Sequence, residues 1–165
     1  CPRGLSNRDW QLLFLSVLWN RDGALHAFGT GPLSNRDVLL AAVRHSGWTL
    51  KEAPAFFLRD KEVVLEAVRE TAASNRKIRN GMDGRLRTSF RSESIFQYAD
   101  ESLRTDPSFV EQICGLDGTA LGCVPRCLQN AAHIACAAVA SDGGALALCP
   151  PQLRGDKDIV LRALE

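Results

Sequence analysis

The sequence has no apolar run long enough to cross a lipid bilayer. Its longest comparable stretch, Ala131 to Ala140, has only ten residues and is interrupted by His133, whereas a membrane-spanning helix needs about 20. No signal peptide or amphipathic presequence opens the chain. Because the sequence begins at Cys1, we expect a processed or trimmed chain. A chain of this kind can still bind at the periphery of a membrane complex.

Neither sign of charge is in excess. Lys and Arg number 20 and Asp and Glu number 19, so no global attraction to nucleic acid or to a membrane surface is expected. Hydrophobic residues make up 45% and charged residues 24%, which is typical of a folded chain rather than a disordered one.

The sequence also lacks the motifs of common catalytic sites. It has no phosphate-binding glycine loop and no Gly-x-Ser-x-Gly elbow. His133 and Cys136 lie three residues apart, but no acid nearby in the sequence could orient a Cys–His pair. We therefore predict a protein without enzymatic activity and without a cofactor.

Six cysteines are too few for a disulfide-built scaffold. Cys123, Cys127, His133 and Cys136 would suit zinc if they converged, although their spacing is not that of paired zinc knuckles. Cys114 and Cys136 fall on or beside the apolar stripes of predicted helices, where small buried residues are expected. The sequence thus favours buried thiols and leaves a disulfide or a metal site as alternatives.

One pattern recurs along the whole chain: two adjacent apolar residues followed four positions later by a second apolar or small pair. Its occurrences start at Leu13, Val38, Val63, Phe109, Ile134 and Ile159. Five intervals separate them, four of 25 residues and one of 46, which equals one regular interval and an insertion of 21 residues. Such regular spacing indicates tandem repeats.

Within each unit the pattern predicts an amphipathic helix, because its residues fall on one face. Asn35, Asp60, Asp106 and Asp156 stand three residues before the apolar pair, where a short polar side chain caps a helix. Pro107 suits the first helical position. We therefore expect helices to begin directly after these residues.

A second, shorter element is expected after each helix and its Gly-containing turn. Its apolar anchors are Leu25, Leu50, Phe96, Leu121 and Leu146. Pro54, Pro125 and Pro150 stand four residues after an anchor and should split this element. The sequence thus predicts an all-α protein. We expect residues 1–165 to form a single domain of tandem helix-turn-helix repeats of about 25 residues, stacked as an α-solenoid-like array.

Three segments carry a family resemblance: Asn35–Val43, Asp60–Val68 and Asp156–Leu164. They resemble the repeats of the domain-of-unknown-function family 4116, which read acid-Lys/Arg-Glu-Val-Val-Leu-x-Ala-Val followed by Asn-Gly. The resemblance implies helical repeats and no catalytic residues. The family is common in unicellular algae, which suggests an organelle, either plastid or mitochondrion, with a cytoplasmic location as the alternative.

The insertion at residues 71–94 is basic and rich in turn signals, so we expect a loop. Its basic residues are Arg76, Lys77, Arg79, Arg85, Arg87 and Arg91. Such a loop suits a solvated surface segment, a protein-docking arm or a phosphate-binding surface. Phe90 is the only aromatic residue in it, which disfavours stacking on single-stranded RNA.

These features favour a non-catalytic helical-repeat protein–protein interaction module. We expect an accessory or structural subunit of a larger organellar assembly, such as a photosystem or a respiratory complex. The basic insertion and a C-terminal apolar face around Ile159 and Leu164 are the predicted contacts with other subunits. A soluble RNA- or phosphate-binding adaptor and a redox or metal-binding module are the alternatives.

Overall fold

The computed structural model describes residues 36–81 and 93–164. This part of the chain is mostly helical and contains no strand, which confirms the all-α prediction. The α-helices are α3 (Arg36–His45), α4 (Lys61–Gly81), α5 (Glu101–Arg104), α6 (Pro107–Leu116), α7 (Arg126–Gln129), α8 (Ala132–Ser141), α9 (Pro151–Arg154) and α10 (Lys157–Arg162). The 3-10 helices are η2 (Gly47–Glu52), η3 (Phe57–Arg59), η4 (Ile95–Tyr98), η5 (Gly118–Cys123) and η6 (Gly143–Leu148). Among the helices of these two ranges, none combines the length and the apolar character needed to cross a bilayer.

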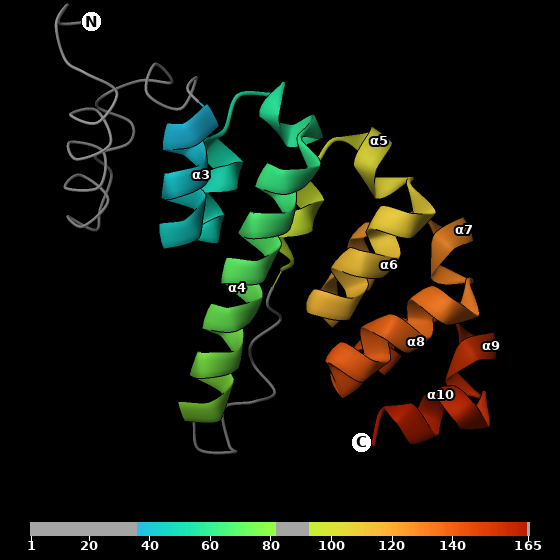
Figure 1. Cartoon of the computed structure of the whole chain (residues 1–165). Coiled ribbons are helices and arrows are strands. Elements are labelled where there is room, and N and C mark those ends of the chain that lie inside the picture. The colour runs from blue at the N-terminus through green and yellow to red at the C-terminus, as the bar shows by residue number, and fades with distance from the viewer. Residues whose placement is uncertain (1–35, 82–92, 165) are drawn as a thin grey trace, which may run out of the picture.

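Five α-helices follow one another side by side in chain order. Figure 1 shows α3, α4, α6, α8 and α10 arranged in this sequence along an arc, and each contacts the next. The short 3-10 helices form a second layer. There, η2 packs on α4 and η5 on α8, the long helices that follow them, whereas η6 packs on both α8 and α10 and η4 packs on α4. The core lies between the two layers.

The predicted helix starts are confirmed wherever the structure describes them. The Asp106 carboxylate accepts hydrogen bonds from the backbone N–H groups of Ser108 (3.1 Å) and Phe109 (3.3 Å), which caps α6. Asp60 and Asp156 cap α4 and α10 in the same way. Asn35 lies outside the described residues. These caps satisfy N–H groups that a helix leaves without an internal partner.

The prolines divide the second elements as predicted. Pro54 separates η2 from η3, Pro125 separates η5 from α7, and Pro150 separates η6 from α9. The same break occurs without proline between η4 and α5, where the carboxylate of Asp100 accepts a hydrogen bond from the N–H of Ser102 at 3.0 Å. A capping side chain thus starts the new helical turn as effectively as a proline does.

The predicted loop is wrong over residues 71–81, because α4 continues without a break to Gly81. The Thr71 hydroxyl donates hydrogen bonds to the carbonyls of Ala67 and Val68 and so fits inside the helix. Ala, Arg and Lys in the following turns are strong helix formers. The Asn80–Gly81 pair, read as part of a loop, instead marks the end of the helix. Residues 82–92 lie outside the described part.

Glycine lets the short elements approach the next long helix closely. A Cβ atom on Gly118 would lie 2.4 Å from the carbonyl oxygen of Ala138. The same contact recurs elsewhere, between Gly47 and Ala67 (2.3 Å) and between Gly143 and Ala163 (2.5 Å). Each glycine precedes its alanine by 20 residues. Any larger residue would therefore push the short element off the helix.

Replacing Gly118 by alanine should lower the free energy of unfolding by about 1–3 kcal/mol, as expected for overpacking against a backbone that cannot yield. Gly115 provides the matched control. A Cβ there meets nothing within 4 Å, so Gly115→Ala in α6 should stabilise by roughly 0.5 kcal/mol through helix propensity. Urea unfolding followed by circular dichroism measures both, and equal effects of the two substitutions would contradict the close-packing explanation.

Candidate docking surface

Charged side chains at the starts of the long helices connect one helix to the next. Arg36, the first residue of α3, pairs through Nε with Oδ2 of Asp60 at 2.7 Å. Lys61, the first residue of α4, pairs through Nζ with Oδ2 of Asp106 at 2.6 Å. In both cases a basic residue at one helix start meets the capping acid of the following helix. We call this arrangement the helix-start ladder.

The same contacts hold two carboxylates in their charged form. Hydrogen bonds from Lys61 and from the Ser108 hydroxyl lower the pKa of Asp106 to about 2. The hydroxyl and the N–H of Ser102, followed by Arg59, lower the pKa of Asp100 to about 2. Each acid therefore combines a capping role with an ion pair to a neighbouring unit, and these contacts account for its position without any catalytic role.

The helix-start ladder is interrupted and then begins again. The first residues of α6 and α8 are Pro107 and Ala132, which carry no charge. A basic residue returns at this position in α10 as Lys157. Its side chain is exposed, and no acid within the described ranges pairs with it.

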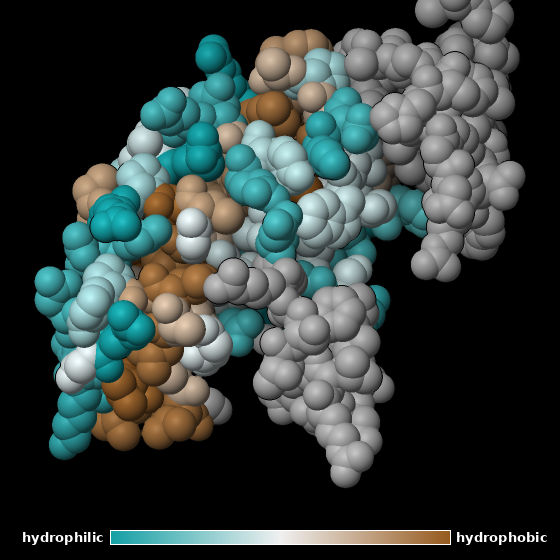
Figure 2. All heavy atoms as spheres, turned by 180° about the vertical axis from the view of Figure 1, so that it is seen from behind, coloured by the Kyte–Doolittle hydropathy of each residue, from teal (hydrophilic) through white to brown (hydrophobic). Residues whose placement is uncertain are grey.

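The face of α10 is unusual in its exposed apolar side chains. Leu164 is 79% exposed and Leu161 is 50% exposed. The 25-residue spacing aligns Leu164 with Val43, Val68, Cys114 and Val139, each of which is at most 1% exposed. Figure 2 shows hydrophobic residues gathered at the end of the molecule where α10 lies. A position that is buried in four other helices is thus open to solvent at Leu164, in the turn that follows α10.

Of the two predicted apolar contact residues, only Leu164 is available to a partner. Ile159 is 2% exposed, because it belongs to the hydrophobic core of the chain itself. The exposed leucine of α10 is Leu161. It was not among the residues predicted from the sequence. Leu161 and Lys157 could have been found by asking which repeat positions lack the partners present in the other units.

The basic residues of the insertion are not gathered into a described site. Arg76 and Lys77 are exposed on α4, and the Arg76 guanidinium donates a hydrogen bond to the Leu116 carbonyl at 3.2 Å. Arg79 also belongs to α4. The remaining three, Arg85, Arg87 and Arg91, lie outside the described residues. The Arg76 contact ties the extended part of α4 to the end of α6.

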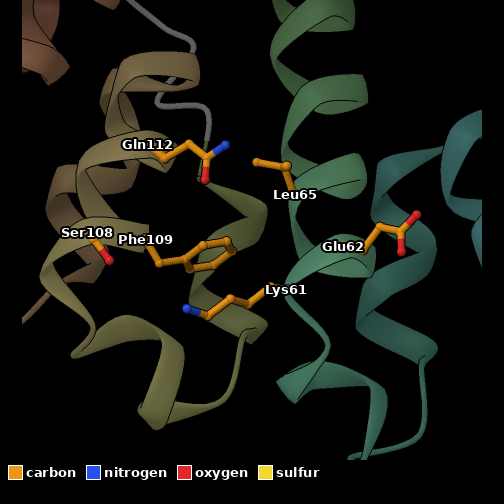
Figure 3. A pocket seen from close by; sticks show the side chains of 6 residues that line it. All are labelled: Lys61, Glu62, Leu65, Ser108, Phe109 and Gln112. Atoms are coloured by element: carbon orange, nitrogen blue, oxygen red, sulfur yellow. The ribbon is translucent and has the colours of Figure 1, made fainter.

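An open pocket of about 310 Å³ lies between the first turns of α4 and α6. It is lined by Lys61, Glu62, Leu65, Ser108, Phe109 and Gln112. Figure 3 shows Lys61 and Phe109 pointing into the space between the helices, while Glu62 points toward α3. The Lys61 Nζ lies 5.4 Å from the centre of the Phe109 ring and is held by Asp106. No residue predicted to form a contact or a metal site lines this pocket.

The cysteines of the described ranges are free thiols. Cys114 is buried as predicted, and burial raises its pKa to about 12; burial also raises the pKa of Cys123 and of Cys149. Cys136 is half-buried and Cys127 is exposed. Among the side chains that the structure describes, no three ligands come together as a metal site would need. A raised pKa disfavours the reactive thiolate.

These helices define an all-α protein whose described part is arranged as two layers along an arc. Residues 35–78 match the model of the family described as Domain of unknown function (DUF4116). This match confirms the family resemblance for α3 and most of α4. Neither a curated protein nor a solved structure matches the chain.

The lowered pKa values of Asp100 and Asp106 predict the acid sensitivity of the fold. An unfolded Asp titrates near pH 3.9. The stabilisation from these two acids should therefore be complete above about pH 5 and be lost as the pH falls through 4 toward 2. Asp106→Asn should reduce the loss of unfolding free energy over this range, as measured by urea unfolding at several pH values.

Glu111→Gln is the matched control for this prediction, because it removes an exposed carboxylate of α6 for which no ion pair is seen. Its stability should fall with pH as steeply as that of the wild type. If Asp106→Asn were equally steep, the pairing of Asp106 with Lys61 would not contribute to the acid sensitivity.

Proposed function

We propose that this chain is a non-catalytic helical-repeat protein–protein interaction module whose units of about 25 residues stack as an α-solenoid-like array. The proposal is supported by contacts that recur with the sequence spacing. Three glycines meet the alanine carbonyl 20 residues further along. Each of η2, η5 and η6 packs on the long helix that follows it. Units that contact only their neighbours in this way are characteristic of solenoids, which present extended binding surfaces.

The observation that carries the interaction role is the exposure of Leu164. Burying a leucine side chain is worth about 1.5–3 kcal/mol, and its aligned residues are buried in four other helices. Leu161 lies half-exposed beside it. Apolar side chains gathered at one place on a surface are typical of contact sites for other proteins. The face of α10 is thus the best-supported docking surface, and we define it by Lys157, Leu161 and Leu164.

An interaction module of this kind suits an accessory subunit of a larger assembly. The organelle, and the choice between a photosynthetic and a respiratory complex, stay predictions from the sequence. The RNA- or phosphate-binding adaptor also stays a prediction, since three of its six basic residues lie outside the described ranges. Nothing in the geometry of Arg76 and Lys77 favours it over protein docking.

The native size of the tagged protein, in an extract of the cells that make it, tests the proposed function. We expect migration in a nuclease-resistant assembly well above the 18.0 kDa of the chain. The double variant Leu161→Ser/Leu164→Ser should leave that assembly and migrate near the monomer mass. Phe56→Ser is the control, because it removes an apolar side chain that is 59% exposed elsewhere on the molecule.

Wild-type protein that migrates near the monomer mass would contradict the subunit role. A size that collapses on nuclease treatment would instead favour the RNA-binding alternative. Urea unfolding of the wild type and the two purified variants ensures that a change in size does not reflect a loss of folding.

A further inference from the structure

Two neighbouring long helices, α3 and α4, carry the same row of side chains. Each row consists of a cation, a leucine and a second cation at intervals of four residues, which places all three along one side of the helix. The rows are Arg36, Leu40 and Arg44 on α3, and Lys61, Leu65 and Arg69 on α4. The two rows differ in what the following long helix places opposite them.

Opposite the row on α3, helix α4 provides two acids four residues apart. Glu62 pairs with Arg36, and Glu66 pairs with Arg44 at 3.8 Å. The leucine between the two arginines, Leu40, is only 7% exposed. Acids and cations thus meet across α3 and α4, and the apolar side chain between them is buried.

Opposite the row on α4, helix α6 provides no acid. The residues aligned with Glu62 and Glu66 are Ser108 and Gln112, which carry no charge. Leu65 is half-buried here and lines the open pocket between the first turns of α4 and α6. Figure 3 shows Leu65 and Gln112 facing each other across this pocket. The pocket therefore lies where the two acids of the α3–α4 pair have no counterpart.

The cations of the α4 row have fewer acids than those of the α3 row. Lys61 pairs with the capping Asp106 alone, whereas Arg36 pairs with a capping acid and with a second acid of α4. Arg69 pairs with no acid of α6 in the part of the chain that the structure describes. It pairs instead with Glu66 of its own helix at 3.3 Å. The side chains of Lys61 and Arg69 are 57% and 51% exposed, so both can meet a further acid.

The other polar groups at the pocket do not compete for these cations. Glu62 is the acid among the lining residues, and it points toward α3, where it pairs with Arg36. Asp106 is engaged in capping α6. The exposed amide of Gln112 adds a neutral N–H donor that a carboxylate can accept from. The pocket thus combines apolar walls with donors that complement a carboxylate.

The pocket lies within the array and not at either end of it. Helix α3 packs on α4, and α8 packs on α6, so further helices stand on both sides (Figure 1). An occupant must therefore come from the exposed face of α4 and α6, and it does not extend the row of long helices.

We propose that this pocket binds a helical segment of another protein that carries two acids four residues apart and an apolar side chain on the same face. The acids take the places that Glu62 and Glu66 have opposite α3, so that one pairs with Lys61 and the other with Arg69. The apolar side chain covers Leu65. This inference goes beyond the proposed function, because the site lies away from the α10 face and does not depend on it.

A labelled alanine-rich peptide that contains the order Glu-Ala-Ala-Leu-Glu provides the probe. In this order the two glutamates and the leucine share one face of a helix. A hydrocarbon staple on the opposite face holds the peptide helical, so that failure to bind cannot be a failure to fold. A second peptide with glutamine in place of both glutamates is the matched control for charge.

Binding of each peptide to the full-length protein is measured by fluorescence anisotropy. We expect saturable binding of the acidic peptide that weakens with added salt. The glutamine peptide should bind roughly fivefold more weakly or worse, because two exposed ion pairs are lost. Arg69→Gln should weaken binding of the acidic peptide roughly threefold, in keeping with one such pair. The control Arg126→Gln removes an exposed arginine of α7 and should bind as the wild type does.

The double variant Ser108→Glu/Gln112→Glu supplies the missing acids from α6 itself. These acids should pair with Lys61 and Arg69, as the acids of α4 pair with the row on α3. We expect peptide binding to fall by about tenfold or more, from lost pairs and added repulsion, while the urea midpoint stays equal or rises. Binding and stability then change in different directions, which a loss of folding cannot produce. Gln152→Glu adds an acid at an exposed position of α9 and should leave binding unchanged.

Three results would overturn the proposed ligand. They are absence of saturable binding to the full-length protein, equal binding of the acidic and glutamine peptides, and binding that persists in the double variant. A chain that dimerises in sedimentation and becomes monomeric with Gln112→Glu would assign the pocket to a second copy and would also overturn it.

This proposal and the proposed function fail separately. Leu161→Ser/Leu164→Ser should leave peptide binding unchanged, because these leucines lie at the α10 face. If the peptide fails to bind while the assembly still depends on those leucines, the pocket proposal alone is wrong. If the peptide binds but the wild-type protein migrates near the monomer mass in the extract, only the subunit role is wrong.

Discussion

The structure depends on one constraint: a long helix cannot bury its own apolar stripe. The stripe is covered only when the next long helix and a short element pack on it, as α8 is covered by α10 and η6. Close approach requires glycine at the contact with the helix backbone, and Gly118 meets this need at the Ala138 carbonyl. The hydrophobic gain from burial thus comes from contacts between successive long helices and the short elements packed on them.

The polar side chains are arranged around the same constraint. Aspartates that cap the long helices also receive basic residues from the preceding helix, so capping and alignment of neighbours rely on one carboxylate. Exposed pairs of this kind contribute little to stability individually. They do set which helix start lies beside which.

The long helices could be predicted from the sequence, because the buried face of each one carries the same pattern of apolar pairs. Asp60, Asp106 and Asp156 mark helix starts, and the prolines mark breaks in the second elements. The insertion interrupts this spacing, and there prediction failed. Turn signals near Gly81 predict a loop, but α4 continues to Gly81 because the residues before it are strong helix formers. For the site, Leu164 is exposed and its contact with a partner stays a prediction, whereas the burial of Ile159 depends on contacts that no single sequence pattern reports.

The central claim, that stacking of 25-residue units determines the fold, is tested most directly by adding a unit. A chain with residues 106–130 duplicated after Asn130 keeps the spacing, whereas a duplicate of residues 106–123 breaks it. The longer duplicate should unfold in one cooperative transition, with a larger helical signal at 222 nm and a higher urea midpoint than the wild type. Loss of cooperative unfolding in that chain, or equally stable folding of both duplicates, would contradict the account.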